Sequence, residues 1–359
     1  MVLHVSICLT TFRRKISYTF KRWIDLTRTK FVIPKGHLET GTHEILENAG
    51  YKMTGLQRTY RPAINDPNIE MKILRPQEIP IHISEGLQDI GITGMDWVRE
   101  TGADVEVLLD LEFGKIRMVL AVPDEWEDVN SLSDLLEVFW KKGKNVRIST
   151  EYLNTAVHYV TSNPIYQETF GDGTPVVITP WWKTGDNSRV SVFLSFGATE
   201  AKPPENADAI MEVVETGTTL QQNNLKIIDT LAESTAVLIA NKKALFDPEK
   251  REKIYDILTL LKGVVDGRKK IHIFVNVREE NLDRLVSELP ALKRPTISPL
   301  SDGGWYSVNT VIDRKDFLET LPTLRKLAQG LVVHVPRQIL SLQELFEGEK
   351  NASKNDDED

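Results

Sequence analysis

The feature that most limits how this chain can fold is an alternation of short, β-rich apolar runs with longer segments of helical periodicity. This order predicts parallel sheets whose strands are joined by crossover helices, an α/β fold. The predicted strands are residues 30–34, 70–75, 90–94, 117–123, 146–150, 175–179, 190–195 and 236–241. The predicted helices between them are residues 43–51, 78–87, 132–140 and 155–162.

The pattern changes from about residue 265, and a linker is expected just before it, near residues 260–270. The later elements form a βαββαβ series, the composition of a small ferredoxin-like domain. Its predicted parts are a strand at 271–277, a helix at 280–289, a turn at 295–300, a strand at 305–312, a helix at 317–328 and a strand at 331–335.

Composition narrows the class of protein. With 359 residues, of which 41% are hydrophobic, the chain is long enough for two or three domains. It has no apolar run of about 18 residues, so no membrane partner is expected. A net charge of −8 argues against nucleic-acid binding, which needs clustered Lys and Arg. The single cysteine, Cys8, fits a reducing cytosol, and a cytoplasmic location is expected.

The two ends differ from the rest of the chain. Residues 1–29 are basic and are expected to be a disordered extension or an over-extended start, with a binding arm as the less favoured alternative. Residues 346–359 are acidic and poor in apolar side chains, which is typical of a disordered tail.

The most informative stretch is residues 207–225, where an apolar strand runs into Thr216, Gly217, Thr218 and Thr219 before a helix. A glycine that allows a tight turn, hydroxyl donors and a helix N-terminus together suit a bound phosphate. A capped turn with threonine as the N-cap is the alternative. Upstream, Glu212 and Glu215 are placed where carboxylates can hold ribose hydroxyls, so the stretch suits phosphoribosyl pyrophosphate.

This stretch resembles the DLVETGTTLxANGL signature of ATP phosphoribosyltransferases, and further segments resemble that family in the same order. Residues 29–39 are similar to its opening strand and PKGRL turn. Residues 75–96 are similar to its RPQDIPxxVExGxxDLGITGxD segment. Residues 110–123 and 293–305 resemble its hinge strand and its C-terminal turn. The resemblance covers residues 30 to 345 and points to the long form, which carries a histidine-binding regulatory domain.

The resemblance implies two periplasmic-binding-protein-like lobes with the active site in their cleft, and a C-terminal ferredoxin-like (ACT-like) domain. The expected lobe I is residues 30–121 with 224–262, and lobe II, with the phosphoribosyl pyrophosphate loop, is residues 122–223. The regulatory domain is expected at residues 265–345. The implied reaction is attack of adenine N1 of ATP on ribose C1 as pyrophosphate leaves, the first step of histidine synthesis.

The resemblance also suggests roles for individual residues. The expected contacts of phosphoribosyl pyrophosphate are Glu212, Glu215, Thr216, Gly217, Thr218, Thr219 and Leu220. The expected contacts of ATP or pyrophosphate are Lys35, Gly36, Arg75, Gly91, Thr93, Gly94, Lys115 and Glu200. Two alternatives to substrate contact are equally open. Arg75 could form a structural ion pair, and residues 90–94 could be a plain strand exit.

Three positions depart from the family pattern. His37 stands where an arginine is usual, which either weakens a phosphate contact or leaves it to Lys35. Glu212 replaces the usual aspartate, and Asn224 replaces a glycine while keeping tolerance of a tight turn. The adjacent Trp181 and Trp182 suggest either an interface or a locally packed hairpin.

The seven histidines are scattered without metal-ligand spacing, so no dedicated metal site is expected. Mg²⁺ is the expected cofactor, arriving with the substrate phosphates, with Glu212 and Glu215 as its candidate protein ligands. In the regulatory domain, Asn276 and Thr296 are the expected contacts of the inhibitor histidine, with strand and turn chemistry as the alternative.

The implied assembly is a homo-oligomer, from dimer to hexamer, with no separate regulatory subunit. The competing interpretation is a non-catalytic two-lobed ligand-binding protein or a regulatory paralogue that has lost its activity. That interpretation leaves the ETGTTL segment, residues 215–220, unexplained.

Overall fold

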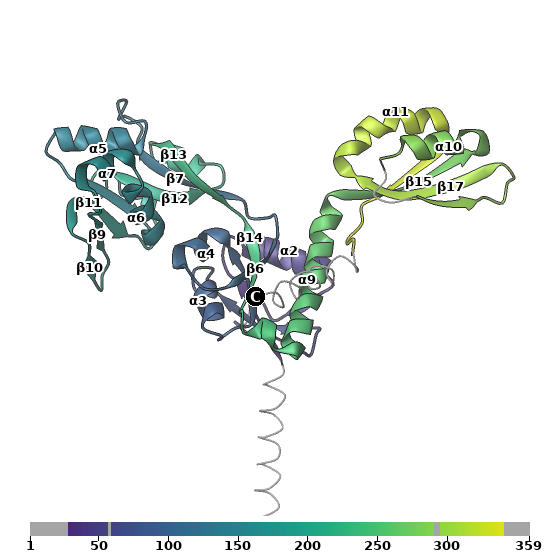
Figure 1. Cartoon of the computed structure of the whole chain (residues 1–359), viewed down its shortest axis with the longest axis horizontal. Helices are drawn as coiled ribbons and strands as arrows, with labels where there is room; N and C mark the ends of the chain where they lie inside the picture. The colour runs from purple at the N-terminus through teal and green to yellow at the C-terminus, as the bar shows by residue number, and fades with distance from the viewer. Residues whose placement is uncertain (1–27, 57–58, 291–294, 341–359) are drawn as a thin grey trace, which may run out of the picture. The chain divides into compact units, whose positions relative to one another are not determined.

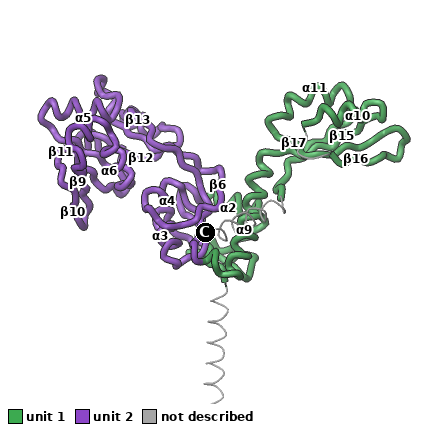
Figure 2. Tube along the Cα trace, in the orientation of Figure 1, with its two compact units in different colours: residues 1–31, 40–72, 244–359 green, residues 32–39, 73–243 purple. Residues whose placement is uncertain are grey.

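The computed structural model describes residues 28–56, 59–290 and 295–340 (Figure 1). By its contacts the chain divides into two compact units (Figure 2). Unit 1 holds the described residues of 1–31, 40–72 and 244–359, and unit 2 holds residues 32–39 and 73–243. The predicted lobe boundaries cut the chain at other positions and stay a prediction.

A five-stranded sheet has the order β4-β1-β5-β14-β6. Its strands are β1 (Thr29–Pro34), β4 (Ile69–Leu74), β5 (Ile90–Gly94), β6 (Glu106–Asp110) and β14 (Ala236–Ala240). Around it lie the helices α2 (Glu39–Asn48), α3 (Ile79–Ser84) and α4 (Met95–Thr101), and the short pair β2 (Met53–Thr54) and β3 (Ala63–Ile64). The predicted strands and helices of this region are confirmed, whereas β6 was not predicted.

Strand β14 corrects the expectation of purely parallel sheets, because it runs antiparallel to both β5 and β6. It is reached from β13 (Leu225–Ser234) across the single residue Thr235, with no crossover helix between them. Strands β13 and β14 belong to different sheets, so the chain passes from one sheet into the next without the crossover helix that would set β14 parallel to its neighbours.

A seven-stranded sheet has the order β10-β9-β11-β8-β12-β7-β13. Its other strands are β7 (Ile116–Pro123), β8 (Val146–Thr150), β9 (Pro175–Ile178), β10 (Lys183–Thr184), β11 (Asn187–Leu194) and β12 (Ala209–Val214). Strand β11 is parallel to β8 and β9, and β12 is parallel to β8. The carboxyl ends of β8, β9, β11 and β12 therefore meet at one edge, the edge at which open α/β sheets bind ligands.

The helices of this sheet start where the sequence supplies caps. They are α5 (Leu132–Lys141), α6 (Leu153–Thr161), α7 (Pro164–Phe170) and the five-residue α8 (Thr218–Gln222). The Ser131 hydroxyl caps α5 by accepting the Asp134 N–H, and the Asn163 amide oxygen caps α7 just before a proline at its first position. Apolar side chains of α5, α6 and α7 pack against the sheet in one continuous buried cluster, and Leu220 of α8 belongs to a second cluster.

The expected linker near residues 260–270 is wrong, because most of it lies in the long helix α9 (Pro248–Arg268). The Asp247 carboxylate accepts the N–H groups of Glu249 and Lys250 and so caps the start of α9. Short 3₁₀ turns stand at η1 (Thr199–Ala201) and at η2 (Ala244–Phe246), the latter just before α9.

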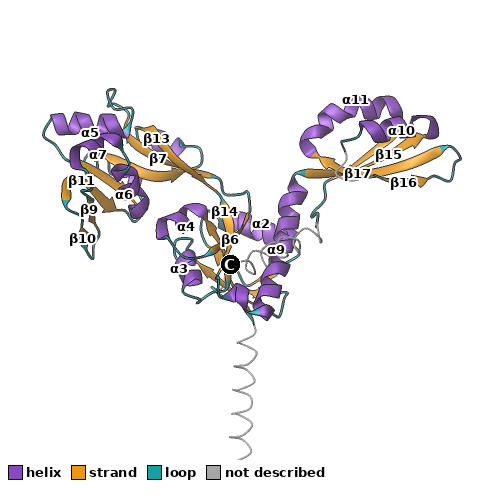
Figure 3. Cartoon of the chain, in the orientation of Figure 1, coloured by secondary structure: helices purple, strands orange, loops and turns teal. Residues whose placement is uncertain are grey.

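The C-terminal part confirms the predicted βαββαβ series, on a sheet of order β16-β17-β15-β18. Its elements are β15 (Lys270–Arg278), α10 (Glu279–Glu288), β16 (Thr296–Pro299), β17 (Trp305–Asp313), η3 (Arg314–Asp316), α11 (Phe317–Leu327) and β18 (Ala328–His334). Figure 3 shows both helices on one face of the sheet, where alternate residues of β15 are buried. The predicted turn at 295–300 is wrong, because residues 296–299 form the edge strand β16.

The predictions for the two ends fall mostly outside the described residues. This holds for residues 1–27 of the predicted extension and for the whole predicted tail, residues 346–359. The last residue of the predicted extension, Thr29, is buried at the start of β1 and donates its N–H to the Asn68 carbonyl at 2.9 Å. The ordered sheet therefore includes the last residue assigned to the extension.

Gly91 of β5 is packed too closely against its neighbours for a side chain to fit without a shift. A Cβ there would lie 2.6 Å from Val32 Cγ1, 2.8 Å from Ile83 Cδ1 and 3.0 Å from the Val32 carbonyl oxygen. We expect Gly91→Ala to lower the free energy of unfolding by about 1–3 kcal/mol, the usual cost of overpacking. The matched control is Gly303→Ala, whose Cβ would meet nothing within 4 Å. Equal denaturation midpoints for the two variants would contradict the packing role of Gly91.

Candidate active site

A cavity of about 590 Å³ lies within unit 2, at the carboxyl edge of the seven-stranded sheet. Strands β8, β11 and β12 bring one wall, and the segments that follow β1 and β4 bring the other. The lining residues are Lys35, Gly36, His37, Arg75, Pro76, Gln77, Trp97, Glu151, Tyr152, Leu194, Ser195, Phe196, Glu212 and Val213.

Two carboxylates face this cavity, Glu151 directly after β8 and Glu212 within β12. Burial raises the pKa of Glu212, and the nearby charges of Glu151 and Glu200 raise it further. Burial also raises the pKa of Glu151, whereas the Gly197 N–H and the positive charges of Lys202 and Arg75 lower it in part. The cavity therefore holds a pair of desolvated acids that gain from a bound cation or from hydroxyl donors.

Lys202 lies close enough to the two carboxylates of this wall to interact with their charges. Its Nζ donates to Ser195 Oγ at 2.5 Å and to Ser149 Oγ at 3.0 Å. Burial lowers the pKa of Lys202, and the charges of Glu212 and Glu151 oppose that shift. This ammonium group offsets part of the negative charge that the two carboxylates bring to the wall.

The acidic wall is tied to helix α4 through the buried acid Asp96. Its carboxylate accepts the Tyr152 hydroxyl at 2.8 Å and the Ser234 hydroxyl at 2.7 Å. The neighbouring Trp97 ring stacks on the Tyr152 ring, with centroids 4.4 Å apart. Burial, followed by the charge and hydrogen bond of Asp96, raises the pKa of Tyr152, so this hydroxyl stays protonated as the donor.

A second acid of α4 makes the same kind of connection. Glu100 accepts the backbone N–H groups of Asn154 and Thr155 at 2.8 and 2.9 Å and the Thr155 hydroxyl at 2.7 Å. These N–H groups belong to the first turn of α6, so Glu100 caps that helix from another element. Together with Asp96 it fixes the position of the segment that carries Glu151.

The opposite wall is basic. Lys35, Gly36 and His37 form the exposed turn after β1, and the Lys35 N–H is held by the Leu74 carbonyl at 2.8 Å. Gly36 has a φ of 97°, a left-handed conformation that favours glycine. The exposed Arg75 follows β4 beside this turn. Cations therefore face carboxylates across one cavity.

Of the predicted substrate contacts, Lys35, Gly36, Arg75 and Glu212 line the cavity. The others lie elsewhere. Residues 90–94 form the buried strand β5, where the Thr93 hydroxyl donates to the Pro76 carbonyl at 2.8 Å. Lys115 and Glu200 are also absent from the cavity lining.

Lys115 forms an ion pair with Glu233 at 2.8 Å, and both side chains are largely exposed. Glu200 is part of η1 and reaches the cavity through its electrostatic effect on Glu212. The Leu220 side chain is buried in an apolar cluster with Val119 and Ile210, so it contributes packing to the phosphate loop.

The predicted phosphate loop follows β12 directly. Gly217 has a φ of 82°, and the Thr216 and Thr218 hydroxyl oxygens lie 2.9 Å apart. Glu215, Thr216, Thr218 and Thr219 are exposed and are absent from the cavity lining. Asn224 has a φ of 55°, which confirms that it occupies the tight-turn position predicted for it.

The sequence analysis missed Glu151, Tyr152, Trp97, Ser195 and Lys202. One signal was available for Glu151 and Tyr152, because they directly follow a predicted strand at the edge where ligands bind. The role of Lys202 depends on a tertiary contact between residues of different elements, which no local pattern reveals.

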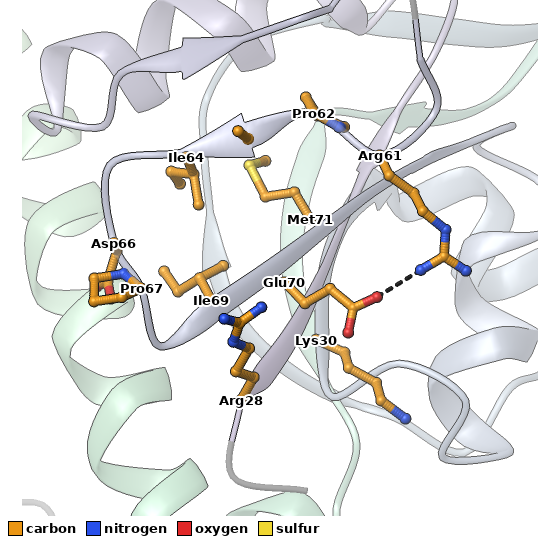
Figure 4. Close-up of a pocket in the computed structure, with 11 residues that line it drawn as sticks. Arg28, Lys30, Arg61, Pro62, Ile64, Asp66, Pro67, Ile69, Glu70 and Met71 are labelled. Atoms are coloured by element: carbon orange, nitrogen blue, oxygen red, sulfur yellow. Dashed lines mark hydrogen bonds and ion pairs between the residues drawn. The ribbon is translucent and has the colours of Figure 1, made fainter. Parts of the chain in front are cut away.

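Unit 1 has a second cavity, of about 680 Å³, beside strand β4 (Figure 4). Its charged lining includes Arg61 and Glu70, which already form an ion pair at 2.6 Å. The lining also holds Arg28, Lys30 and Asp66 but none of the predicted substrate contacts, so this cavity has a weaker case than the first as the reaction site.

The protein has an α/β fold, and its first cavity has carboxylates on one wall and cations on the other. The family model described as HisG, ATP phosphoribosyltransferase, matches residues 75–263. The model described as HisG, C-terminal domain, matches residues 267–335.

Known proteins agree with this match. The ATP phosphoribosyltransferase of Solibacter usitatus is 39% identical over 312 residues, 86% of this chain and 97% of that protein. That of Chlorobaculum parvum is 37% identical over 308 residues, 84% of this chain and 94% of that protein. A chain of the ATP phosphoribosyl transferase (HisG:HisZ) complex from Thermotoga maritima aligns with a TM-score of 0.48 and 24% identity, over 66% of this chain and 98% of that chain.

The chain belongs to the ATP phosphoribosyltransferase family, in its long form with a C-terminal domain. It transfers the 5-phosphoribosyl group of phosphoribosyl pyrophosphate to N1 of ATP, the first step of histidine synthesis. Within the described part of the chain, no helix is long and apolar enough to cross a membrane.

The raised pKa of Glu212 predicts a pH-dependent stability. Because the folded state holds this proton more tightly than the unfolded chain, stability falls as pH rises from the ordinary glutamate pKa through the raised one. Glu212→Gln removes that loss. We therefore expect the melting temperature of Glu212→Gln, relative to the unmodified protein, to increase as pH is raised from about 4 to about 7.

The matched control is Glu168→Gln on α7, whose side chain is exposed. Its melting temperature should follow the unmodified protein at every pH. An offset for Glu212→Gln that does not vary with pH would contradict the assignment of Glu212 as a half-buried acid that titrates in this range.

Proposed function

We propose that the cavity between Glu151, Glu212, Lys35 and Arg75 is where ATP and phosphoribosyl pyrophosphate react. The observation that carries the proposal is the presence of two desolvated carboxylates and two cationic side chains on the walls of one cavity. The substrates present ribose hydroxyls to the first kind of group and phosphates to the second.

The phosphoribosyl end is assigned to β12 and the loop after it. Glu212 faces the ribose hydroxyls, and the 5-phosphate binds to residues 216–219, where the backbone turns at Gly217 and exposed threonine hydroxyls can donate. Glu151 takes the second carboxylate position, which the sequence pattern gave to Glu215. This choice is supported by the cavity lining, which includes Glu151 and lacks Glu215.

The pyrophosphate and triphosphate groups are assigned to the basic wall. Lys35, the Gly36 backbone and Arg75 meet the leaving pyrophosphate, where developing negative charge gains most from fixed cations. Lys115 and Glu200 are secondary candidates outside the lining. Gly91, Thr93 and Gly94 act through packing of β5 and not through contact.

In the reaction, the lone pair of adenine N1 attacks ribose C1, the N1–C1 bond forms, and the bond from C1 to the pyrophosphate oxygen breaks. The residues align the two substrates and exclude water from the activated sugar. Mg²⁺ fits this site, because Glu151 and Glu212 supply the one or two carboxylates that it uses beside substrate phosphates, and when bound it stabilises the leaving pyrophosphate.

We further propose that the C-terminal domain binds histidine as a feedback inhibitor. Asn276 on β15 pairs with Ser307, and Thr296 on β16 pairs with Asn309 of the same strand, β17. Paired and alternate residues share one face of a sheet, so Asn276 and Thr296 lie on the face opposite the buried residues of β15. This placement supports a shared site for histidine.

The proposed assembly is a homo-oligomer, from dimer to hexamer, without a separate regulatory subunit.

The catalytic assignment predicts a kinetic phenotype for the phosphate loop. We expect Thr218→Val to raise the KM for phosphoribosyl pyrophosphate by about 10-fold, the loss of one charge-assisted hydrogen bond, with a small change in the KM for ATP. The measurement is phosphoribosyl-ATP formation by absorbance, with a pyrophosphatase present.

Thr169→Val is the control, since this exposed hydroxyl bonds only within α7 in the described contacts. Unchanged kinetics for Thr218→Val would remove the loop from the site. An unmodified protein that binds ATP but forms no product would favour a non-catalytic binding protein.

The regulatory assignment predicts that Asn276→Ala weakens inhibition by histidine about 10-fold or more, while activity without histidine stays unchanged. The reason is that an amide side chain can offer a donor and an acceptor to the amino acid. Inhibition curves at fixed substrate measure the effect. Retained inhibition in both Asn276→Ala and Thr296→Val would place the effector elsewhere.

A further inference from the structure

The turn that follows β9 has no role in the site described above, although it stands at the same sheet edge. Strands β9 and β11 are parallel, with Ile178 opposite Phe193, and Leu194 of β11 is opposite Thr150 of β8. The chain therefore leaves these strands at one edge, toward residues 179–182, Phe196 and Glu151. Topology alone brings the turn to the edge that carries the cavity.

This turn is held in one conformation by Thr179. Its hydroxyl oxygen accepts the N–H groups of Trp181 and Trp182 at 3.3 and 3.0 Å, and its own backbone N–H donates to the Trp182 carbonyl at 3.0 Å. Pro180 restricts the backbone between them. The backbone that carries the Trp181 indole is thus held in place before any ligand arrives, which lowers the entropic cost of binding to this turn.

Two aromatic rings meet at this place with most of their surface in solvent. The Trp181 side chain is 72% exposed and Phe196 is 69% exposed, and their ring centroids lie 5.8 Å apart at 81°. Phe196 also lines the cavity, so the aromatic pair is continuous with it. Rings nearly at right angles form a corner that can take the face of a flat ligand on one ring and its edge on the other.

We propose that Trp181 and Phe196 form the platform for the purine base of the nucleotide substrate. This inference rests on the proposed function, in which the charged walls hold the phosphates and the sugar. The base needs a site with two properties: it must fix the plane of the ring, and it must leave the N1 lone pair free to attack. Stacking meets both, because it uses the π face and makes no hydrogen bond to N1.

The test compares the KM for ATP and for phosphoribosyl pyrophosphate in Trp181→Ala, Trp181→Phe and Phe196→Ala. Stacking of a base on an aromatic side chain contributes about 1–3 kcal/mol, so loss of the ring should raise the KM for ATP by roughly 5- to 150-fold. The KM for phosphoribosyl pyrophosphate should stay unchanged. Trp181→Phe, which keeps a ring, should recover most of the affinity for ATP.

The control is Phe246→Ala, since Phe246 is 83% exposed in η2 and belongs to unit 1, whereas the aromatic pair belongs to unit 2. Its kinetics should match the unmodified protein. Calorimetry with ATP and with inorganic tripolyphosphate separates base from phosphates: Trp181→Ala should weaken ATP binding and leave tripolyphosphate binding unchanged.

Unchanged KM and Kd for ATP in both alanine variants would overturn the platform, and a changed oligomeric state with unaltered ATP affinity would assign the ring pair to a subunit interface instead. If the unmodified protein forms no product, the proposed function fails, and ATP calorimetry on the same variants still decides whether the platform binds the base.

Discussion

The candidate active-site cavity depends on the contact between helix α4 and the start of helix α6. Asp96 and Glu100 are buried carboxylates on α4, and each accepts at least two hydrogen bonds, several of them from residues 152–155. A hydrogen bond to a charged group contributes about 1.5–3 kcal/mol, and losing its partners leaves a buried charge uncompensated. This contact therefore ties the acidic wall to the element that carries the stacked Trp97.

Charge is distributed within the cavity in a way that suits the reaction. The chain as a whole is acidic, with a net charge of −8. The candidate site nevertheless has Lys35 and Arg75 on one wall and Glu151 and Glu212 on the other. Lys202 interacts electrostatically with both carboxylates. Such an arrangement is prepared for a ligand that brings both phosphates and a cation. Because the nucleophile needs no deprotonation, catalysis here is a matter of alignment and of charge that is already in place.

Much of the fold could be predicted from sequence, because buried strands and amphipathic helices leave local patterns. The eight strands predicted up to residue 241 are present, whereas β6 and β13 were missed because their apolar runs are only two or three residues long and are flanked by charged side chains. The linker predicted near residues 260–270 was wrong because Gly263 and Gly267, which suggest a break, lie inside α9 and are buried there.

The site was predictable only where a motif marks it. Glu212 and Lys35 stand in recognisable segments and line the cavity, whereas the IGITG segment, residues 90–94, lies in the buried strand β5 outside the lining, and its role as a contact stays a prediction. Glu151 and Lys202 owe their importance to partners about 50 residues or more away in the chain, as in the Lys202–Ser149 bond. Such pairings are set by topology and not by local sequence.

The most direct test of this account is the equilibrium affinity of Mg–phosphoribosyl pyrophosphate for Glu151→Gln, measured by calorimetry beside the exposed variant Glu168→Gln. If Glu151 holds the sugar or its metal ion, its loss should weaken binding by about 10-fold or more, the effect of removing one hydrogen bond to a charged group, while Glu168→Gln binds normally. Equal affinities for the two variants would contradict the assignment of this cavity as the phosphoribosyl site.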